Sequence, residues 1–272
     1  MPPLSLDHLT VIDATPLELI DAAAAGGFDA VGLRVVTPLA AKEAFPVIGQ
    51  PEVLRALKAR MAATGIKIGL VESIWLGADS DPDALEPAMA TGAELGAQFA
   101  LVAANDADEA RLIDNLGRLA GIAKTHGLKI AFEFMPFTQV RSLAQALRIK
   151  EQVAAPNLRL LIDALHISRS GADMRALPTV DSSVVGYVHL CDAPAKPPPP
   201  EGLRDEARLG RLYPGEGALP LDDFLDAMPG DVPIGVEAPC RAYAHLPPVE
   251  RGRRAGEVTR VFLAHRAARA RT

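Results

Sequence analysis

Short apolar segments alternate with longer amphipathic segments along the whole sequence. The short segments are rich in Val, Ile and Leu, a composition typical of strands that are buried on both faces. We expect strands at residues 5–11, 30–36, 67–73, 98–103, 129–135, 158–163, 184–190 and 232–238. Helical patterns are expected at residues 16–26, 51–64, 82–95, 108–126, 138–154 and 249–270. This alternation constrains the fold more than any other feature of the chain.

Eight strands, each followed by a helix or by a loop with a short helix, predict an α/β fold of the (β/α)₈ TIM barrel type. The length of 272 residues suits one such barrel, so we expect a single domain over residues 1–272. The main alternative is a doubly wound open sheet, which usually carries a glycine-rich turn after its first strand. No such turn follows residues 5–11, so the barrel is favoured.

Four polar residues lie at the carboxyl ends of predicted strands, namely Glu133, Asp163, His189 and Glu237. A charged or imidazole side chain at the end of a buried strand is costly unless something compensates it. The carboxyl ends of barrel strands meet at one face, where active sites lie. Three carboxylates and one imidazole could together bind a divalent metal ion. The alternatives are salt bridges for the two glutamates, a helix N-cap for Asp163 and a satisfied core position for His189.

These strand ends form a combined pattern of E in the fifth strand, D-x-x-H in the sixth, H-x-x-D in the seventh and E in the eighth. The pattern resembles that of the xylose isomerase-like barrels, and the resemblance extends over nearly the whole chain. That family contains sugar isomerases and epimerases, hydroxypyruvate isomerase, dehydratases and metal-dependent apurinic endonucleases. After Asp192 the sequence departs from the family, because A-P-A and a proline run replace the usual Asn or Gly. This departure affects the inference about which substrate is bound, and it leaves the inference about metal binding unchanged.

The resemblance implies that the four strand-end residues are the ligands of one divalent metal ion. It also implies that Glu133 and Glu237 flank the substrate carbon and transfer protons as the catalytic pair. His166, from the D-x-x-H motif, would contact the substrate. An arginine from the loop after the seventh strand would do the same, and Arg204 and Arg208 both qualify for this role.

Further polar or aromatic residues near strand ends could contact a substrate, namely His8, Arg34, Glu72, Trp75 and Asn105. Trp75 is the only tryptophan and could stack on a sugar ring or anchor a loop. Glu72, at the expected end of the third strand, could instead pair with Arg34. The segment 191–220 is long for a βα loop and is either a lid over the barrel mouth or a surface excursion. Its start beside His189 favours the lid.

We expect a metal-dependent isomerase or epimerase acting on a sugar or a related hydroxy-carbonyl compound. Removing a proton next to a carbonyl gives an enediolate, which a divalent cation stabilises while a glutamate acts as the base. The alternative is a lyase or dehydratase that uses the same enolate and expels a β-oxygen. An endonuclease of the multi-zinc branch is less favoured because the chain has only six histidines. The ligand set favours Mn²⁺ and also admits Mg²⁺, Co²⁺ or Zn²⁺.

Composition limits the partners. The net charge of −6 argues against extended contacts with phosphate backbones, so we expect a small-molecule substrate and no nucleic acid. No apolar run reaches about 18 residues, so no membrane span is expected, and the first residues lack the pattern of a signal peptide. Only Cys191 and Cys240 are present, which predicts a cytoplasmic location without a disulfide framework. The sequence leaves homo-oligomer formation open.

Overall fold

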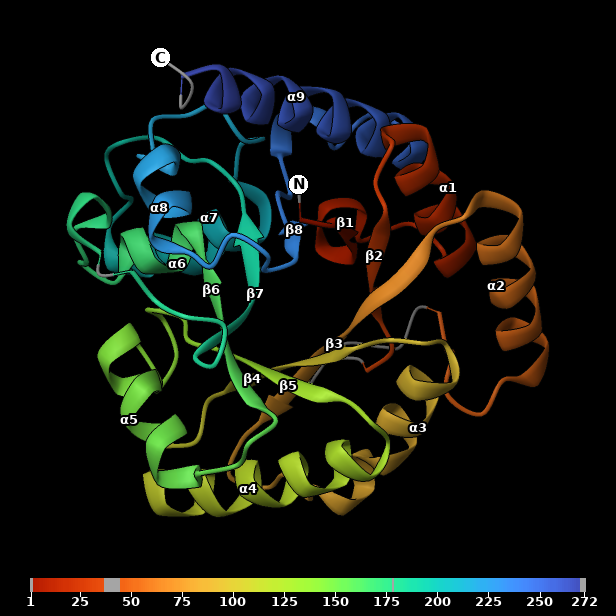
Figure 1. Ribbon diagram of the computed structural model, residues 1–272, viewed down its shortest axis with the longest axis vertical. Helices are drawn as coiled ribbons and strands as arrows, with labels where there is room; N and C mark the ends of the chain where they lie inside the picture. The colour runs from red at the N-terminus through yellow and green to blue at the C-terminus, as the bar shows by residue number, and fades with distance from the viewer. Residues whose placement is uncertain (1, 37–44, 178, 270–272) are drawn as a thin grey trace.

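The structure is a computed structural model that describes residues 2–36, 45–177 and 179–269. Its strands follow sequence order around a closed barrel, and each strand is parallel to both of its neighbours. The helices surround this barrel as an outer ring (Figure 1). The expected (β/α)₈ fold is therefore confirmed. The strands are β1 (Leu4–Asp7), β2 (Ala30–Arg34), β3 (Lys67–Leu76), β4 (Phe99–Ala104), β5 (Lys129–Glu133), β6 (Leu158–Asp163), β7 (Val185–Leu190) and β8 (Ile234–Val236).

The helices confirm most of the expected segments. The first two coincide with their expected ranges, since a proline begins each helix and a glycine with positive φ directly follows its last residue. Residue 270, the expected end of the last helix, lies outside the described residues. The helices are α1 (Pro16–Gly26), α2 (Pro51–Thr64), α3 (Glu86–Glu94), α4 (Glu109–Thr125), α5 (Leu143–Val153), α6 (Ala164–Arg169), α7 (Leu203–Leu209), α8 (Leu221–Ala227) and α9 (Pro248–Arg269).

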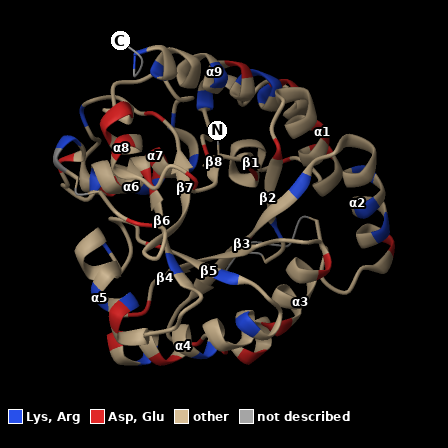
Figure 2. Cartoon of the chain, in the orientation of Figure 1, with Lys and Arg blue, Asp and Glu red and all other residues tan. Residues whose placement is uncertain are grey.

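Charged residues gather on the outer helices, whereas the strands carry few of them (Figure 2). Within the described residues, no helix combines the length and the hydropathy that are needed to span a lipid bilayer. The apolar faces of the helices instead pack against the outside of the barrel, where they form the larger of two hydrophobic clusters.

The smaller cluster fills the inside of the barrel and consists of Leu70, Phe99, Leu101, Ala131, Leu161 and Tyr187. Successive side chains of a strand point to opposite faces, so a residue two positions further along faces inward as well. In β5, β6 and β7 these positions hold Glu133, Asp163 and His189. By the same rule, the side chain of Glu72 in β3, two positions after Leu70, points inward. A polar layer therefore lies directly above the apolar layer, at the C-terminal end of the barrel.

Two strands differ from the sequence-based expectation. β1 ends at Asp7, and the residues expected to continue it form a 3₁₀ turn (His8–Val11). β3 continues to Leu76, and its pairing with β4 shifts register near its middle. The prediction that Glu72 ends the third strand is therefore wrong. A register shift depends on the neighbouring strand, which the local pattern of β3 does not contain.

Candidate metal centre

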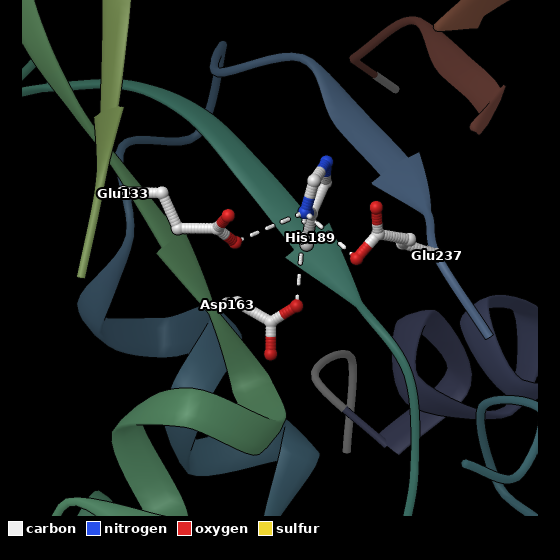
Figure 3. Close-up of side chains that lie close together, drawn as sticks. All are labelled: Glu133, Asp163, His189 and Glu237. Atoms are coloured by element: carbon white, nitrogen blue, oxygen red, sulfur yellow. Dashed lines mark ion pairs between the residues drawn. The ribbon is translucent and has the colours of Figure 1, made fainter. Parts of the chain in front are cut away.

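The four strand-end residues converge at the C-terminal end of the barrel (Figure 3). Glu133 ends β5, Asp163 ends β6, His189 is the last residue but one of β7, and Glu237 directly follows β8. The Nδ1 atom of His189 lies 3.4 Å from Glu133 Oε1 and 3.5 Å from Glu237 Oε2. It lies 3.7 Å from Asp163 Oδ2. All four residues are buried, and their potential ligand atoms lie within 4.8 Å of one another.

The donor atoms of this cluster fit a divalent metal ion. Glu133 Oε1 and His189 Nδ1 are buried and have no hydrogen-bond partner among the described residues. A buried polar atom without a partner is costly, and a shared cation between these atoms would remove that cost. Three carboxylates with one imidazole suit several divalent ions. Their role as ligands stays a prediction, now with a geometry that a single ion can satisfy.

Burial and neighbouring charges shift the pKa values of the cluster. Burial is the main cause that raises the pKa of Glu133 to about 7; His189 opposes the rise, and Glu237 and Asp163 add to it. For His189, burial alone would lower the pKa, but Glu237, Asp7 and Glu133 together raise it well above its usual range. The carboxylates therefore favour a positive charge at the centre of the cluster.

Asp163 caps a helix with one carboxylate oxygen and faces the cluster with the other, so the two interpretations that the sequence offered are compatible. Its Oδ1 atom accepts hydrogen bonds from the backbone N–H groups of Leu165 (2.7 Å) and His166 (3.0 Å), which caps α6. Its Oδ2 atom faces His189. Burial would raise the pKa of Asp163, but Arg211 and the nearby imidazoles hold it below its usual range. The carboxylate is therefore ionised and oriented by the helix that it begins.

Arg211 is a functional candidate that the sequence analysis missed. Its guanidinium is fully buried and donates hydrogen bonds from Nη1 to Asp163 Oδ2 (2.6 Å) and to the carbonyl oxygen of Glu237 (2.9 Å). Its Nη2 atom lies 3.0 Å from Glu237 Oε2. The arginine therefore holds two of the candidate ligands. Its spacing from Arg204 and Arg208, seven and three residues, matches one helical face and could have indicated it.

Asp7 was also missed. Its Oδ2 atom lies 2.8 Å from Nε2 of His189, on the side of the ring opposite the other carboxylates. The hydroxyls of Ser5 and Tyr187 donate to its Oδ1 atom at 2.7 and 3.2 Å. A carboxylate in this position orients an imidazole for metal binding. The expected strand at 5–11 placed Asp7 in mid-strand, so its position at the end of β1 was not apparent.

A cavity of about 390 Å³ opens beside the cluster, and Glu133 and Glu237 are part of its wall. Most of the residues that we expected to contact a substrate line this cavity. They are Arg34, Glu72, Trp75, Asn105, His166, Arg204 and Arg208. The structure thus gathers them around one space, and their contact with a substrate stays a prediction.

His166 has a free hydrogen-bonding atom beside the cavity. Its ring lies edge-on to Phe137, with centroids 5.5 Å apart, and its Nε2 atom is 3.5 Å from Arg211 Nη2. Burial lowers the pKa of His166 to about 4; Asp163 opposes this shift and Arg211 adds to it. The imidazole is therefore neutral at pH 7, and Nε2 accepts from Arg211. Its Nδ1 is buried without a partner among the described residues and can donate to a substrate oxygen.

His8 does not line the cavity, unlike the other candidates. Its Nε2 atom donates to the carbonyl oxygen of Ala14 (3.0 Å), and its Nδ1 atom accepts from the backbone N–H of Arg34 (3.2 Å). Burial lowers the pKa of His8 to about 4, so the ring is neutral at pH 7. Both ring nitrogens are thus engaged by the backbone, which gives His8 a structural role and leaves it no free atom for a substrate.

Glu72 is buried near the cluster. It accepts a hydrogen bond from the backbone N–H of His8 (2.9 Å). Burial is the main cause that raises its pKa to about 8; Glu237 and Asp7 add to the rise, and Arg34 opposes it. Arg34 and Glu72 are register partners across β2 and β3, yet no salt bridge joins them within the described part of the chain.

The loop after β7 contributes Arg204, Ala207, Arg208 and Arg211 to the lining of the cavity, and its function as a lid stays a prediction. Asp192 organises this loop, because the two carboxylate oxygens accept from four backbone N–H groups, those of Ala193, Gly215, Gly217 and Leu219. Arg169 of α6 holds α7 through a two-pronged ion pair with Glu206, at 2.9 and 2.7 Å. Within this loop, burial raises the pKa of Cys191 to about 12 and keeps it a thiol, in line with a space-filling role.

Comparisons with known proteins agree with this architecture. The sequence model of a family described as xylose isomerase-like TIM barrel matches residues 20–262. An inosose isomerase of Bacillus subtilis is 33% identical over 118 residues, which are 43% of this chain and 41% of the relative. An inosose dehydratase of Salmonella typhimurium is 28% identical over 122 residues, which are 45% of this chain and 40% of the relative. The matched region is thus less than half the length of these curated relatives.

A solved structure of the IOLI protein with a binding zinc atom has the same fold. It superposes with a TM-score of 0.76 at 22% sequence identity, and the alignment covers 95% of this chain and 96% of that one. The fold, the order of the strand-end motifs and the family match over residues 20–262 agree with one another. The chain belongs to the xylose isomerase-like TIM barrel family.

Proposed function

We propose that the protein is a metal-dependent isomerase or epimerase that acts on a sugar or a related hydroxy-carbonyl compound. The observation that carries this proposal is the convergence of Glu133, Asp163, His189 and Glu237 beside a cavity that both polar and apolar side chains line. The inosose isomerase relative supports the reaction class. The zinc-containing neighbour supports a divalent metal, and Mn²⁺ stays a preference based on the donor atoms alone.

Glu133 and Glu237 are the proposed proton-transfer pair. They come from different strands and approach the centre from opposite sides of His189 (Figure 3). A divalent ion held here would polarise the substrate carbonyl and stabilise the negative charge of the enediolate. One glutamate takes the proton from the carbon next to the carbonyl, and the other returns a proton from its own side. His166 donates from Nδ1 to a substrate oxygen, while Arg211 keeps Glu237 in place.

A lyase or dehydratase is the second candidate, favoured by the inosose dehydratase relative. The same glutamate would remove the same proton in this reaction. The two reactions then differ only in the fate of the enolate, because a dehydratase expels the oxygen on the next carbon. The identity of the product therefore separates them.

Proton exchange in deuterated water tests both candidates. The metal-loaded protein is incubated with ketoses, inososes and keto acids, and proton NMR records deuterium entering the carbon next to the carbonyl. Glu133→Gln and Glu237→Gln should each lower the exchange rate by at least about a hundredfold, because an acid or base is lost. Glu201→Gln is the matched control, since this glutamate is exposed on the loop after β7. Wild-type exchange in a metal-loaded Gln variant would exclude that glutamate from proton transfer.

A further inference from the structure

One face of the short helix α7 presents positive charge to the cavity. Arg204, Ala207 and Arg208 follow the spacing of one face of α7 and line the cavity. Arg211, two residues after the end of the helix, lines the same cavity. The acidic residues of the same helix pair elsewhere. Asp205 accepts a hydrogen bond from Arg241 (2.8 Å), and Glu206 pairs with Arg169. The helix thus separates its charges, with the arginines toward the cavity and the carboxylates away from it.

The end of β2 contributes another arginine to the cavity wall. Arg34 ends β2, and its Nε atom is buried without a hydrogen-bond partner among the described residues. Arg204 lies against the ring of Phe137, with its guanidinium carbon 5.5 Å from the ring centroid. Within the described residues, no salt bridge joins Arg34, Arg204 or Arg208 to a carboxylate. These three guanidinium groups therefore face the cavity with hydrogen-bonding capacity to spare.

The charges of the metal centre do not compensate these arginines. The carboxylates of Glu133, Asp163 and Glu237 together carry three negative charges when ionised, which the proposed divalent ion and Arg211 would balance. Glu72 can offset at most one of the three remaining arginines. At least two positive charges on the cavity wall are therefore left without an opposite charge among the cavity residues.

We propose that the substrate carries an anionic group, a carboxylate or a phosphate, and that Arg34, Arg204 and Arg208, which line the cavity, recognise this group. The proposal rests on the proposed function, whose substrate class it narrows. The planar guanidinium matches two oxygens of a carboxylate or phosphate at once, whereas a neutral polyol leaves the positive charges unbalanced. The cavity of about 390 Å³ has room for a small sugar acid or sugar phosphate.

Three related probes test this inference, namely D-fructose, D-fructuronate and D-fructose 6-phosphate. They share the hydroxy-ketone end and differ only at the sixth carbon, which is a hydroxymethyl group, a carboxylate group or a phosphorylated hydroxymethyl group. Calorimetric titration measures the affinity of each probe for metal-loaded protein and for chelator-treated protein. The chelator-treated protein is included because a phosphate cannot bind to it through the metal. At least one anionic probe should bind about tenfold or more tightly than D-fructose in both preparations. The tighter of the two anions identifies the preferred group.

Arginine variants test whether the cavity arginines cause the tighter binding of the anionic probes. Arg34→Gln and Arg204→Gln should each reduce the ratio of anion affinity to D-fructose affinity toward one. Arg241→Gln is the matched control and should preserve the ratio, because Arg241 follows β8, pairs with Asp205 of α7 and is not among the residues that line the cavity. Anions that bind no more tightly than D-fructose to the wild type, or a ratio that neither cavity variant lowers, would overturn the inference. Tight anion binding without proton exchange for any compound would instead reject the proposed function and leave this inference standing.

Discussion

At the scale of single residues, Asp7 shows how glycines make room for a buried carboxylate. A Cβ atom at Gly235 would lie 1.9 Å from Asp7 Oδ2, and a Cβ atom at Gly32 would lie 2.6 Å from Asp7 Oδ1. Glycine on both neighbouring strands therefore lets Asp7 occupy the inside of the barrel and reach His189. A carboxylate behind a metal-binding imidazole fixes the orientation of the ring and makes the nitrogen a better ligand.

Asp7→Asn should weaken metal binding without removing any proposed ligand. We expect the metal affinity to fall about ten- to a hundredfold, because the imidazole loses the carboxylate that orients it. Competition with a chromogenic chelator measures this affinity. Asp29→Asn is the matched control, since Asp29 binds the backbone N–H of Leu4 at the other end of β1. Equal metal affinities for the Asp7 variant and the wild type would contradict the positioning role.

At the scale of secondary-structure elements, α1 and α9 pack through glycines and thereby join the two ends of the chain. A Cβ atom at Gly256 would lie 2.0 Å from the carbonyl oxygen of Gly26, and one at Gly252 would lie 2.6 Å from that of Ala22. The helix backbones can approach this closely only because these positions carry no side chain. The contact fixes the last helix beside the first helix (Figure 1).

Gly256→Ala should therefore destabilise the protein, although alanine is the better helix former. We expect a loss of about 1–3 kcal/mol in the free energy of unfolding, because the added methyl group forces the two helices apart. Gly121→Ala in α4 is the control; a Cβ atom there meets nothing within 4 Å, so this change should add up to about 1 kcal/mol. Urea denaturation measures both. If the two variants are equally stable, close packing of α1 and α9 does not limit stability.

At the scale of the whole molecule, the candidate metal centre connects the second half of the barrel. Its four residues come from β5, β6, β7 and the end of β8. Arg211 connects the loop after β7 to this site through its ion pair with Asp163. A cation bound at this point would join elements that are distant in sequence. A ligand that binds only the folded state stabilises the entire cooperative unit, so its effect should appear in global unfolding.

Metal removal should lower the melting temperature. At a free metal concentration about a hundredfold above Kd, Zn²⁺ or Mn²⁺ should raise the Tm of chelator-treated protein by about 5–10 °C. Asp163→Asn should lose most of this rise; its amide oxygen can still cap α6, but the ligand charge is gone. Differential scanning fluorimetry records both. A wild-type Tm that does not change when metal is added, or an equal rise of the Tm in the Asp163 variant, would argue against metal binding at this site.

Much of the fold could be predicted from local sequence features. The helix at 16–26 has its boundaries because Thr15 and Glu18 form a capping box, and Gly27 adopts the left-handed conformation that ends the helix. The strands follow from short apolar runs. The same runs indicated the candidate metal centre, because a polar residue at the end of a buried strand stands out from its apolar neighbours.

The sequence by itself determined the barrel, the four strand-end residues and the family, because each depends on patterns within one segment or on the order of such segments. Only the tertiary structure decided the roles of Arg211, Asp7 and His8. Arg211 reaches the cluster because Asp192 and α6 fix the path of its loop. Asp7 meets His189 across the barrel, and His8 turns its ring to the backbone instead of the cavity. Such contacts join residues far apart in sequence, so no local pattern encodes them.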